Sequence, residues 1–378
     1  MINNPLNIQS ASDEPLIEQI RNDLRQKVRS GQLKPGYRLP SMRKLSDDLG
    51  VSLGIVHQAI NTLTAEGVLD SQPRRGVFVI DPKIKKRDVA LILGSLQLPS
   101  MSAAIRGIRA GLRMASQTPP YRLMIHAADT DFDQQMDLLL KLDTQSLAGA
   151  IILPPGSSQY IDAFRAFADK GIPCIQASIA LEGLNMNAVV VDGLETGRML
   201  FGHLLEAGHR KIGIVSNTAD TQTRMDIHSG AAMVLDEYGI NFDDLPSVQT
   251  NVTHLNPDEP WRDGQEAATR LLTEHPDINA CVGMDNSLTL GIYKAAKAMG
   301  RKLPDELSII GMGADQTVFS MTDPAITMVD MGLEKICQHA AVRLRQMIDP
   351  KGSTPQRVSQ VMPRLLQRES VAKITNSA

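Results

Sequence analysis

Nine residues within the first 76 positions have the chemistry and the spacing to contact a nucleic acid. They stand either at the start of a short amphipathic segment or at a turn between two β-type runs. Arginine guanidinium groups can bind phosphate oxygens and guanine edges through two parallel hydrogen bonds. The nine candidates are Ser41, Arg43, Ser52, Leu53, Gly54, His57, Arg74, Arg75 and Gly76.

Three helices are expected to position the first six of these residues. The segment 15–30 carries an apolar residue about once per helical turn, which predicts an amphipathic helix. Ser41 and Ser52 are suited to the N-cap positions of two shorter helices, and Gly50 separates them. Two short helices joined by a tight turn form a helix-turn-helix, whose second helix can bring its first turn into the major groove.

A hairpin is expected to follow the helices. Residues 68–69 and 77–80 are apolar and β-branched, and they flank a turn over 73–76. The turn holds Arg74 and Arg75, so it predicts a wing whose tip can reach the DNA backbone or the minor groove. Periodicity of this kind also occurs in three-helix bundles that bind no DNA.

Charge is distributed unevenly along the chain. Residues 1–87 hold 14 Lys and Arg against 9 Asp and Glu, a balance of +5, whereas the rest of the chain has a balance of −8. A basic N-terminal part on an acidic body indicates that only the former meets a polyanion. The alternative interpretation is that the imbalance is a chance variation of surface charge.

Length and composition exclude several classes of protein. The chain of 378 residues is long enough for two or three domains. It has no apolar run long enough to span a membrane, and MINNPLNIQS does not resemble a secretory signal. The cysteines Cys174, Cys281 and Cys337 are odd in number and widely spaced, which argues against a disulfide framework or a zinc site and fits a reducing cytoplasm.

The body beyond residue 87 has the pattern of an α/β protein. Residues 81–87 (DPKIKKR) predict an exposed linker, whose cations either touch phosphate or are simply solvated. Afterwards short apolar strands alternate with helices in two consecutive series, which predicts two lobes, each with a doubly wound parallel sheet. Ligands of such sheets bind beyond the carboxyl ends of the strands. The expected strands are 89–93, 121–126, 149–153, 173–177, 188–191, 211–215, 247–251, 279–283 and 307–311, and the expected helices are 102–116, 131–142, 158–170, 193–207, 224–238, 263–274 and 286–299.

The N-terminal segment resembles the winged helix of the GntR family along the run PLIEQIRNDLRQKVRSGQLKPGYRLPSMRKLSDDLGVSLGIVHQAINTLTAEGVLDSQPRRGVFV. Its most specific pieces are GQLKPGYRLPS, RKLSDDLGVS and AEGVLDSQPRRGVFV. The resemblance implies that Arg43 and residues 52–57 contact DNA. The family usually has Arg where this chain has Leu53, a hydroxyl residue in place of Gly54 and often Arg in place of His57. These departures imply an altered operator sequence.

The segment from about residue 88 to 371 resembles the effector-binding core of LacI-type regulators, which is itself similar to periplasmic sugar-binding proteins. The motifs LLEAGHRKIGIVS, LGIYKAAKAMGRKLPDELSIIGMG, DPAITMVDMG and PRLLQRES occur in family order. The combined resemblance implies a winged helix-turn-helix domain at 1–80, a linker at 81–87 and an effector-binding and dimerisation domain at 88–378.

The second resemblance also implies which residues line a ligand cleft. In relatives an arginine after the first strand of the second lobe grips sugar hydroxyls, and Arg224 is the nearest arginine here, about one helical turn before that position. Trp261 is displaced by two residues from the position where relatives carry an aromatic that stacks on sugars. Relatives carry Asn-Asp where this chain carries Asp285-Asn286, and an aspartate where it carries Gly313. A surface arginine and a core tryptophan are the alternative interpretations. The candidates are Leu96, Ser100, Ala127, Pro154, Ser178, Asn217, Arg224, Trp261 and Asp285.

These observations predict a cytoplasmic, homodimeric transcription repressor of carbohydrate-metabolism genes. It would bind double-stranded operator DNA and be released or modulated by a small-molecule effector, either a sugar or a sugar derivative. A regulator of the same architecture whose cleft no longer binds a sugar is the alternative. An enzyme is not expected, because GxSxG, Walker, HExxH and CxxC motifs are absent and too few residues remain for a vitamin-B6-dependent aminotransferase domain. No cofactor, metal or membrane partner is predicted.

Overall fold

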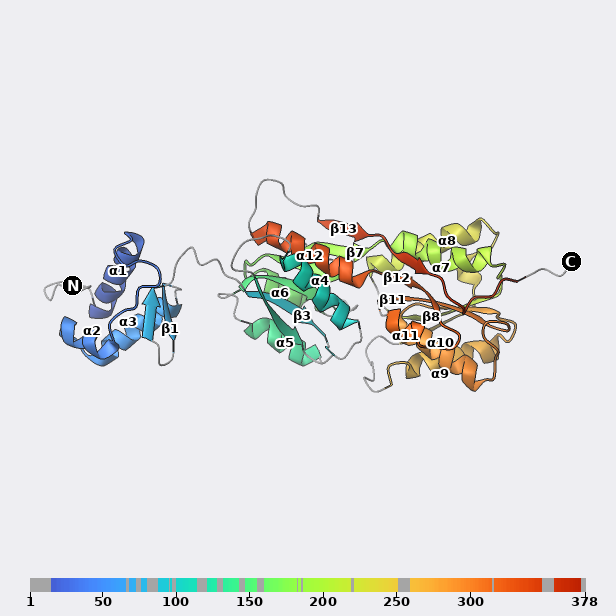
Figure 1. Cartoon of the computed structure of the whole chain (residues 1–378), viewed down its shortest axis with the longest axis horizontal. Helices are drawn as coiled ribbons and strands as arrows, with labels where there is room; N and C mark the ends of the chain where they lie inside the picture. The colour runs from blue at the N-terminus through green and yellow to red at the C-terminus, as the bar shows by residue number, and fades with distance from the viewer. Residues whose placement is uncertain are drawn as a thin grey trace. The chain divides into compact units, whose positions relative to one another are not determined.

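The computed structural model divides into two compact units, residues 1–86 and 87–378 (Figure 1). The predicted linker at 81–87 lies outside the residues that the structure describes. The described residues are 15–65, 68–72, 76–79, 88–94, 96, 100–113, 121–127, 132–142, 147–154, 160–181, 183–184, 186–218, 221–250, 259–314, 316–348 and 357–374.

The first unit is a three-helix domain with an antiparallel hairpin. Twelve side chains, among them Leu24, Val56 and Leu63, form its buried core. A bridge between Arg38 and Phe78 attaches the segment before the second helix to the hairpin. The predicted three helices and wing strands are therefore present. Their bounds are α1 Leu16–Arg29, α2 Met42–Leu49, α3 Leu53–Ala65, β1 Leu69–Gln72 and β2 Gly76–Val79.

The second unit contains two six-stranded sheets. The first sheet is fully parallel in the order β13-β7-β6-β5-β3-β4, and the second has the order β14-β12-β11-β10-β8-β9 with only β14 antiparallel. The predicted α/β class with two doubly wound sheets is confirmed. The strands are β3 Asp88–Leu93, β4 Arg122–Ala127, β5 Leu147–Leu153, β6 Cys174–Ser178, β7 Asn187–Val191, β8 Ile212–Asn217, β9 Ser247–Thr250, β10 Ala280–Gly283, β11 Ser308–Gly313, β12 Thr327–Asp330, β13 Val358–Val361 and β14 Arg364–Leu366.

Helices cover both faces of these sheets. In the second sheet, α7 and α8 pack over one core cluster, while α9 and α10 pack over another on the opposite face. Side chains of successive strand residues point to opposite faces, so Ile214 belongs to the first cluster and Val215 to the second. The helices are α4 Met101–Arg113, α5 Phe132–Lys141, α6 Ile161–Ala168, α7 Gly193–Glu206, α8 Gln222–Asp236, the 3-10 helix η2 Phe242–Asp244, α9 Arg262–Glu274, α10 Asn286–Ala298, α11 Gln316–Ser320 and α12 Leu333–Ile348.

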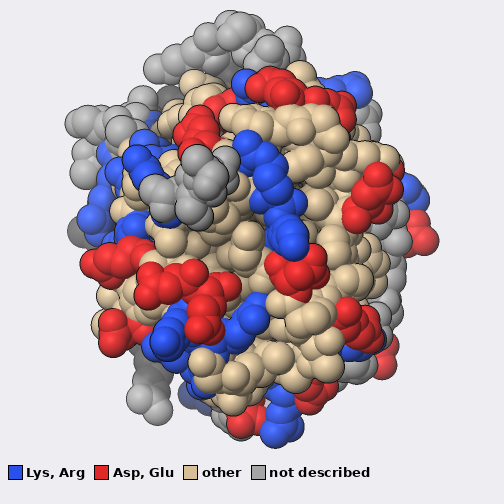
Figure 2. All heavy atoms as spheres, turned by 90° about the vertical axis from the view of Figure 1, so that its right-hand side faces the viewer, with Lys and Arg blue, Asp and Glu red and all other residues tan. Residues whose placement is uncertain are grey.

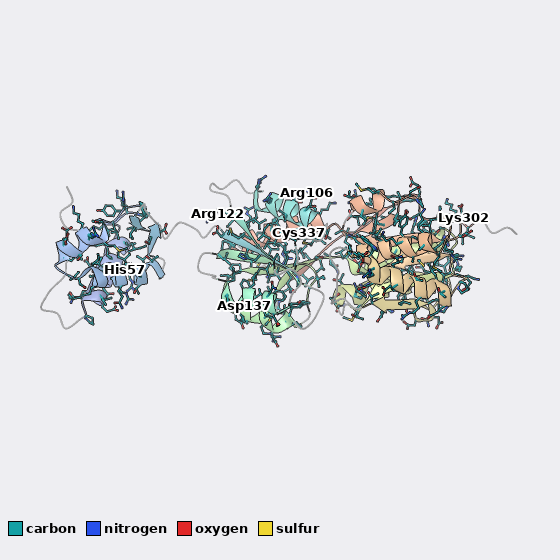
Figure 3. All side chains as sticks on the ribbon, turned by 90° about the horizontal axis from the view of Figure 1, so that it is seen from below. His57, Arg106, Arg122, Asp137, Lys302 and Cys337 are labelled. Carbon is teal, nitrogen blue, oxygen red and sulfur yellow. The ribbon has the colours of Figure 1, made fainter. Side chains whose placement is uncertain are left out.

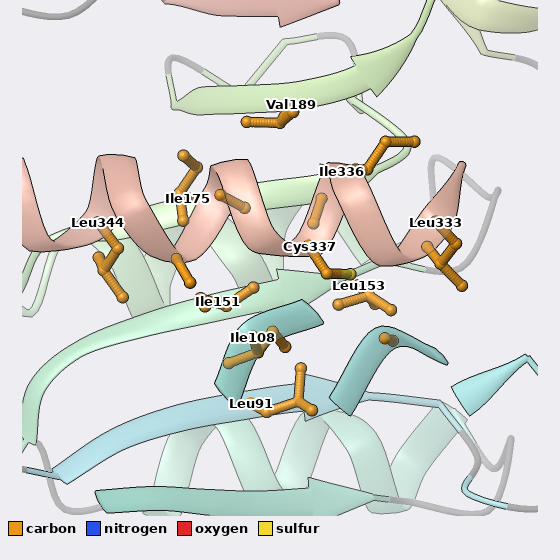
Figure 4. Close-up of a cluster of buried hydrophobic side chains, with 14 of the residues drawn as sticks. Leu91, Ile108, Ile151, Leu153, Ile175, Val189, Leu333, Ile336, Cys337 and Leu344 are labelled. Carbon is orange, nitrogen blue, oxygen red and sulfur yellow. The ribbon is translucent and has the colours of Figure 1, made fainter. Parts of the chain in front are cut away.

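The alternating pattern predicted that each lobe is built from one continuous stretch of chain, and this prediction is wrong. After β12 in the second sheet, α12 packs against α4 of the first lobe, and β13 pairs in parallel with β7. The chain then returns, and β14 pairs with β12. Figure 4 shows α12 contributing Leu333, Cys337 and Leu344 to the core of the first lobe.

The cysteines, the surface charges and the described helices show no special chemistry. All three cysteines are buried as free thiols, and burial raises the pKa of each to about 12, so the thiolate form is suppressed. On the face drawn in Figure 2, acidic and basic side chains are interspersed. Among the described helices, none combines the length and the apolar character needed to cross a membrane.

Candidate functional sites

The turn between α2 and α3 is held by side-chain caps. Ser41 Oγ accepts a hydrogen bond from Lys44 N at 3.2 Å, and Ser52 Oγ accepts one from Ile55 N at 3.3 Å. Gly50 adopts the left-handed conformation, with φ of 64°, where a side chain would cost energy. Ser46 Oγ closes the turn by donating to the carbonyl of Val51 at 2.6 Å. These contacts fix the direction in which α3 leaves the turn.

The outer face of α3 carries its candidate DNA contacts. Val56, Ile60 and Leu63 are fully buried on the inner face, whereas Gly54 and His57 are exposed and Leu53 is 45% exposed. The His57 ring, labelled in Figure 3, lies 3.1 Å from the side-chain amide nitrogen of Asn61 one turn later. The side chain of Leu53 is thus accessible at the start of the helix.

Two further polar residues on α3 were missed by sequence reasoning. Gln58 and Asn61 are exposed and lie on the same helical face as Gly54 and His57. Side-chain amides bind adenine edges through two hydrogen bonds. Gln58 stands four residues after Gly54 and Asn61 four residues after His57, and this spacing was the signal that could have identified them.

The predicted contacts outside α3 differ in how far the structure describes them. Arg43 is exposed in the first turn of α2. Arg74 and Arg75 lie outside the described residues, while Gly76 begins β2 with φ of 112°. A Cβ atom at Gly76 would lie 2.8 Å from Nε of Arg38, so the Arg38 guanidinium sits at the base of the wing. Arg38 is thus a third unpredicted residue, and it places a cation beside Gly76.

The predicted ligand residues of the first lobe stand at the carboxyl ends of its strands. Leu96 follows β3, Ala127 ends β4, Pro154 follows β5 and Ser178 ends β6. Pro154 is buried, Leu96 is 46% exposed, and Ser178 has a positive φ of 76°. A non-glycine residue keeps that strained conformation only where the surrounding structure holds it. Such residues are concentrated at active sites and ligand-binding sites.

Ser100 lies at the beginning of α4. Its carbonyl accepts hydrogen bonds from Ala103 N at 3.1 Å and Ala104 N at 3.3 Å, so the residue forms the first turn of the helix. The Ser100 side chain is only half-buried. It therefore stands on the element that follows β3, on the side of the sheet where its ligands would bind.

Three predicted residues of the second lobe form one hydrogen-bonded network. Arg224 Nη2 donates to Asn217 Oδ1 at 2.6 Å, and Asn217 Nδ2 donates to Asp285 Oδ2 at 3.0 Å. Asp285 also caps α10 by accepting from Leu288 N at 2.7 Å. Residues from β8, α8 and the β10–α10 junction are thereby joined at the carboxyl end of the sheet.

Burial dominates the electrostatics of this network. Desolvation raises the pKa of Asp285, opposed by its hydrogen bond from Leu288, the nearby Arg224 cation and Asn217. Desolvation also lowers the pKa of Arg224, and the Asp285 charge partly offsets this. Nη1 of Arg224 is buried without a hydrogen-bond partner among the described residues. The network thus holds a donor that a bound molecule could satisfy.

Gly313 and Asn286 are complementary in space. A Cβ atom at Gly313 would collide with Oδ1 of Asn286, because the Asn286 side chain fills the volume that a residue 313 side chain would need. Asn286 Oδ1 is buried without a hydrogen-bond partner among the described residues. Any side chain at position 313 and the Asn286 amide would therefore compete for the same space.

The described ring contact of Trp261 is with Lys294 and not with the Arg224 network. Trp261 is the residue before α9, it is half-buried, and Lys294 Nζ of α10 lies 4.3 Å from the centroid of its ring. This cation–π contact joins α9 to α10. The structure thus brings Asn217, Arg224 and Asp285 together and gives Trp261 a partner of its own.

Two family models match the chain. Residues 16–79 match the model of the bacterial regulatory proteins of the gntR family, and residues 201–371 match that of a periplasmic binding protein-like domain. The predicted combination of the two domains is confirmed. The first match covers the helix-turn-helix and wing, and the second covers the Arg224 network.

Similar proteins are transcriptional regulators. The arabinose metabolism transcriptional repressor of Geobacillus stearothermophilus is 23% identical over 369 residues, covering 95% of this chain and 98% of that protein. The solved complex of the transcriptional regulator CelR with cellobiose has a TM-score of 0.65 at 19% identity, covering 88% of this chain and 100% of that one. A LacI family regulator from Enterococcus faecium with bound ribose has a TM-score of 0.61 at 21% identity, covering 76% and 100%. At these identities the two solved structures establish the fold alone.

Proposed function

We propose that this chain, which joins a GntR-family DNA-binding domain to a periplasmic-binding-protein-like domain, is a transcription repressor controlled by a small molecule. The observation that carries the proposal is the exposed first turn of α3, held by two serine caps and a glycine turn in a chain whose relatives regulate transcription. The head binds operator DNA, and the body binds the effector. As a DNA-binding regulator it works in the cytoplasm.

The head is expected to use few bidentate contacts to guanine. Leu53 can pack against a thymine methyl group, and Gln58 and Asn61 can bind adenine. Arg43 and the wing cations Arg74 and Arg75 bind phosphate or a groove edge, which fixes the position of the head on the duplex. An operator half-site rich in A·T pairs follows from this set of side chains.

The body is expected to bind a sugar or a sugar derivative. The named relative regulates arabinose metabolism, and the two solved structures hold cellobiose and ribose. Candidate residues at the strand ends of the second lobe supply the contacts, with Arg224 offering a buried donor. Ligand binding alters operator affinity only if the ligand prefers one arrangement of the lobes.

Two copies of the chain are expected to act together. A homodimer formed through the bodies would present two heads to a near-palindromic operator, because half-site symmetry follows protein symmetry. Half-sites about one helical turn apart, or a multiple of it, would match such a dimer. Sedimentation of the full chain with and without operator DNA measures this stoichiometry.

The proposal is tested with the purified full chain and the DNA upstream of its own gene. Fluorescence anisotropy should show saturable binding that competes poorly with unrelated DNA and weakens steeply with added salt. Sequencing of DNA crosslinked to the protein in cells would give the operator and the controlled genes. Equal binding to unrelated DNA would contradict an operator-specific repressor.

A regulator without a sugar effector is the second candidate, and one observation favours it. Gly313 lacks the carboxylate that the resemblance implies for hydroxyl recognition, and Asn286 occupies that space. Calorimetry of the full chain against neutral and charged sugars separates the two candidates, since the second predicts no heat of binding with any of them.

A further inference from the structure

A pocket beside the Arg224 network has the size and chemistry of a small-molecule site. It lies between α8, η2 and the edge of the second sheet at β8 and β9, and its volume is about 310 Å³. This volume is at the lower end of the range for ligand pockets and suits a molecule of monosaccharide size. Asn217 and Arg224 line it, so the pocket and the network share two residues.

Strand register explains why polar groups face this pocket. Ile214 pairs with Ser247 and Ser216 pairs with Gln249, so these four side chains share one face of the sheet. Val248 points to the opposite face and is buried there. Ser247 and Gln249 lie on the edge strand β9 and are exposed. They point to the face of the sheet on which α8 packs, but α8 does not cover them. Their hydroxyl and amide groups are open to a ligand.

The walls of the pocket combine an apolar surface with one buried cation. The His228 and Phe242 rings form an edge-on pair 4.1 Å apart, and both line the cavity. Arg224 contributes its guanidinium, whose Nη1 has no hydrogen-bond partner among the described residues. The described lining includes no carboxylate; Asp285 reaches Arg224 through Asn217, and the Asp243 carboxylate lies 3.5 Å from Nε2 of the lining His228. A buried cation beside polar neutral groups favours an anionic ligand.

We propose that the effector is a small hydroxylated organic anion whose carboxylate or phosphate group binds Arg224 in this pocket. Its hydroxyl groups then meet Ser216, Ser247 and Gln249, while its carbon skeleton lies on Phe242. The inference rests on the proposed function, because it names the effector class of the regulator.

Calorimetry of the full chain provides the test, with gluconate and ribose 5-phosphate as anionic probes and glucose and ribose as neutral ones. At least one anion should bind about tenfold or more tightly than its neutral counterpart, since a charge-assisted hydrogen bond to a buried guanidinium is lost with the neutral sugar. A preference for gluconate assigns a carboxylate, and a preference for ribose 5-phosphate assigns a phosphate.

Two variants locate the bound anion. Arg224→Gln should weaken anion binding about 10- to 100-fold, and Gln249→Glu, which adds a carboxylate on the exposed edge strand, should weaken it about tenfold. Arg270→Gln on the exposed face of α9 is the matched control and should bind like the wild type. Gln249→Glu keeps the test decisive if Arg224→Gln disturbs folding.

The inference is overturned if neither anion binds, if glucose or ribose binds as tightly as its anionic counterpart, or if Gln249→Glu leaves anion affinity unchanged. Operator binding, measured on the same preparations by anisotropy, separates this failure from that of the proposed function. Retained operator binding with no anion response defeats only the effector class. Loss of operator specificity in the wild type defeats the proposed function itself.

Discussion

The DNA-binding head and the second lobe of the body use polar side chains in opposite ways. In the head, Arg43 and His57 stand exposed on helices whose caps are already satisfied. In the lobe, Arg224 and Asp285 are partly buried and joined through Asn217. Exposed cations attract any polyanion at little cost in folding free energy, whereas buried ones must be compensated and therefore discriminate among ligands.

The largest expected effect is on the stability of the body, when a side chain is added at the packed position Gly313. Gly313→Asp forces a side chain onto Asn286 and should lower the free energy of unfolding of the body by about 3 kcal/mol. Urea denaturation followed by circular dichroism measures this loss. Operator affinity of folded protein should change little, because the head is a separate compact unit.

A double variant sharpens this prediction. Adding Asn286→Ala to Gly313→Asp removes the colliding amide and should recover most of the lost stability, giving a favourable interaction energy between the two sites. Asn286→Ala alone is the matched control. Equal losses in the single and double variants would show that the collision is not what makes residue 313 a glycine.

The next effect concerns the exposed cations of the head. Arg43→Ala should weaken operator binding by about tenfold or more without changing the unfolding of either unit. Arg75→Ala, at the wing tip predicted from sequence, should act in the same direction. Arg270→Ala on α9 serves as the control, and normal operator binding by both head variants would refute the assignment of the interface.

A smaller effect is expected from the titration of Asp285. Its folded pKa is raised by burial, so the folded state holds this proton more tightly than the unfolded chain does. The associated stability is present below the ordinary value of 3.8 and is lost as the pH rises through the raised pKa. Asp285→Asn keeps the helix cap and removes this component. Unfolding free energies of the two proteins from pH 3 upward should therefore diverge in slope above about pH 4, and parallel curves would contradict it.

Sequence reasoning succeeded where the determining contacts are local. Ser41, Gly50 and Ser52 specify caps and a turn within a few residues of themselves, and the helices they bound were predicted. It failed where distant segments meet. The pairing of β13 with β7 joins residues about 170 positions apart, and nothing in the sequence VSQV distinguishes it from an isolated exposed strand.

The candidate site divides along the same line. Asn217, Arg224 and Asp285 could be proposed individually from their places after strands, but their shared network depends on three elements meeting in the fold. The coupling of Gly313 to Asn286 likewise appeared in sequence as two unrelated departures. The pocket at Gln249 was missed because it depends on the register between β8 and β9, which periodicity does not determine.

The smallest effect on stability is expected at Leu53, and it tests whether the head tolerates charge as the comparison requires. Leu53 is 45% exposed at the first position of α3, so Leu53→Arg should change the unfolding free energy by less than about 0.5 kcal/mol. The added guanidinium should strengthen binding to unrelated DNA and steepen the dependence of log K on log salt by about one unit, because one more phosphate is neutralised. Anisotropy titrations at several salt concentrations, with Leu53→Gln as the uncharged control, measure both slopes. An unchanged slope would place this turn of α3 away from the DNA and refute the assignment of Leu53 to the interface.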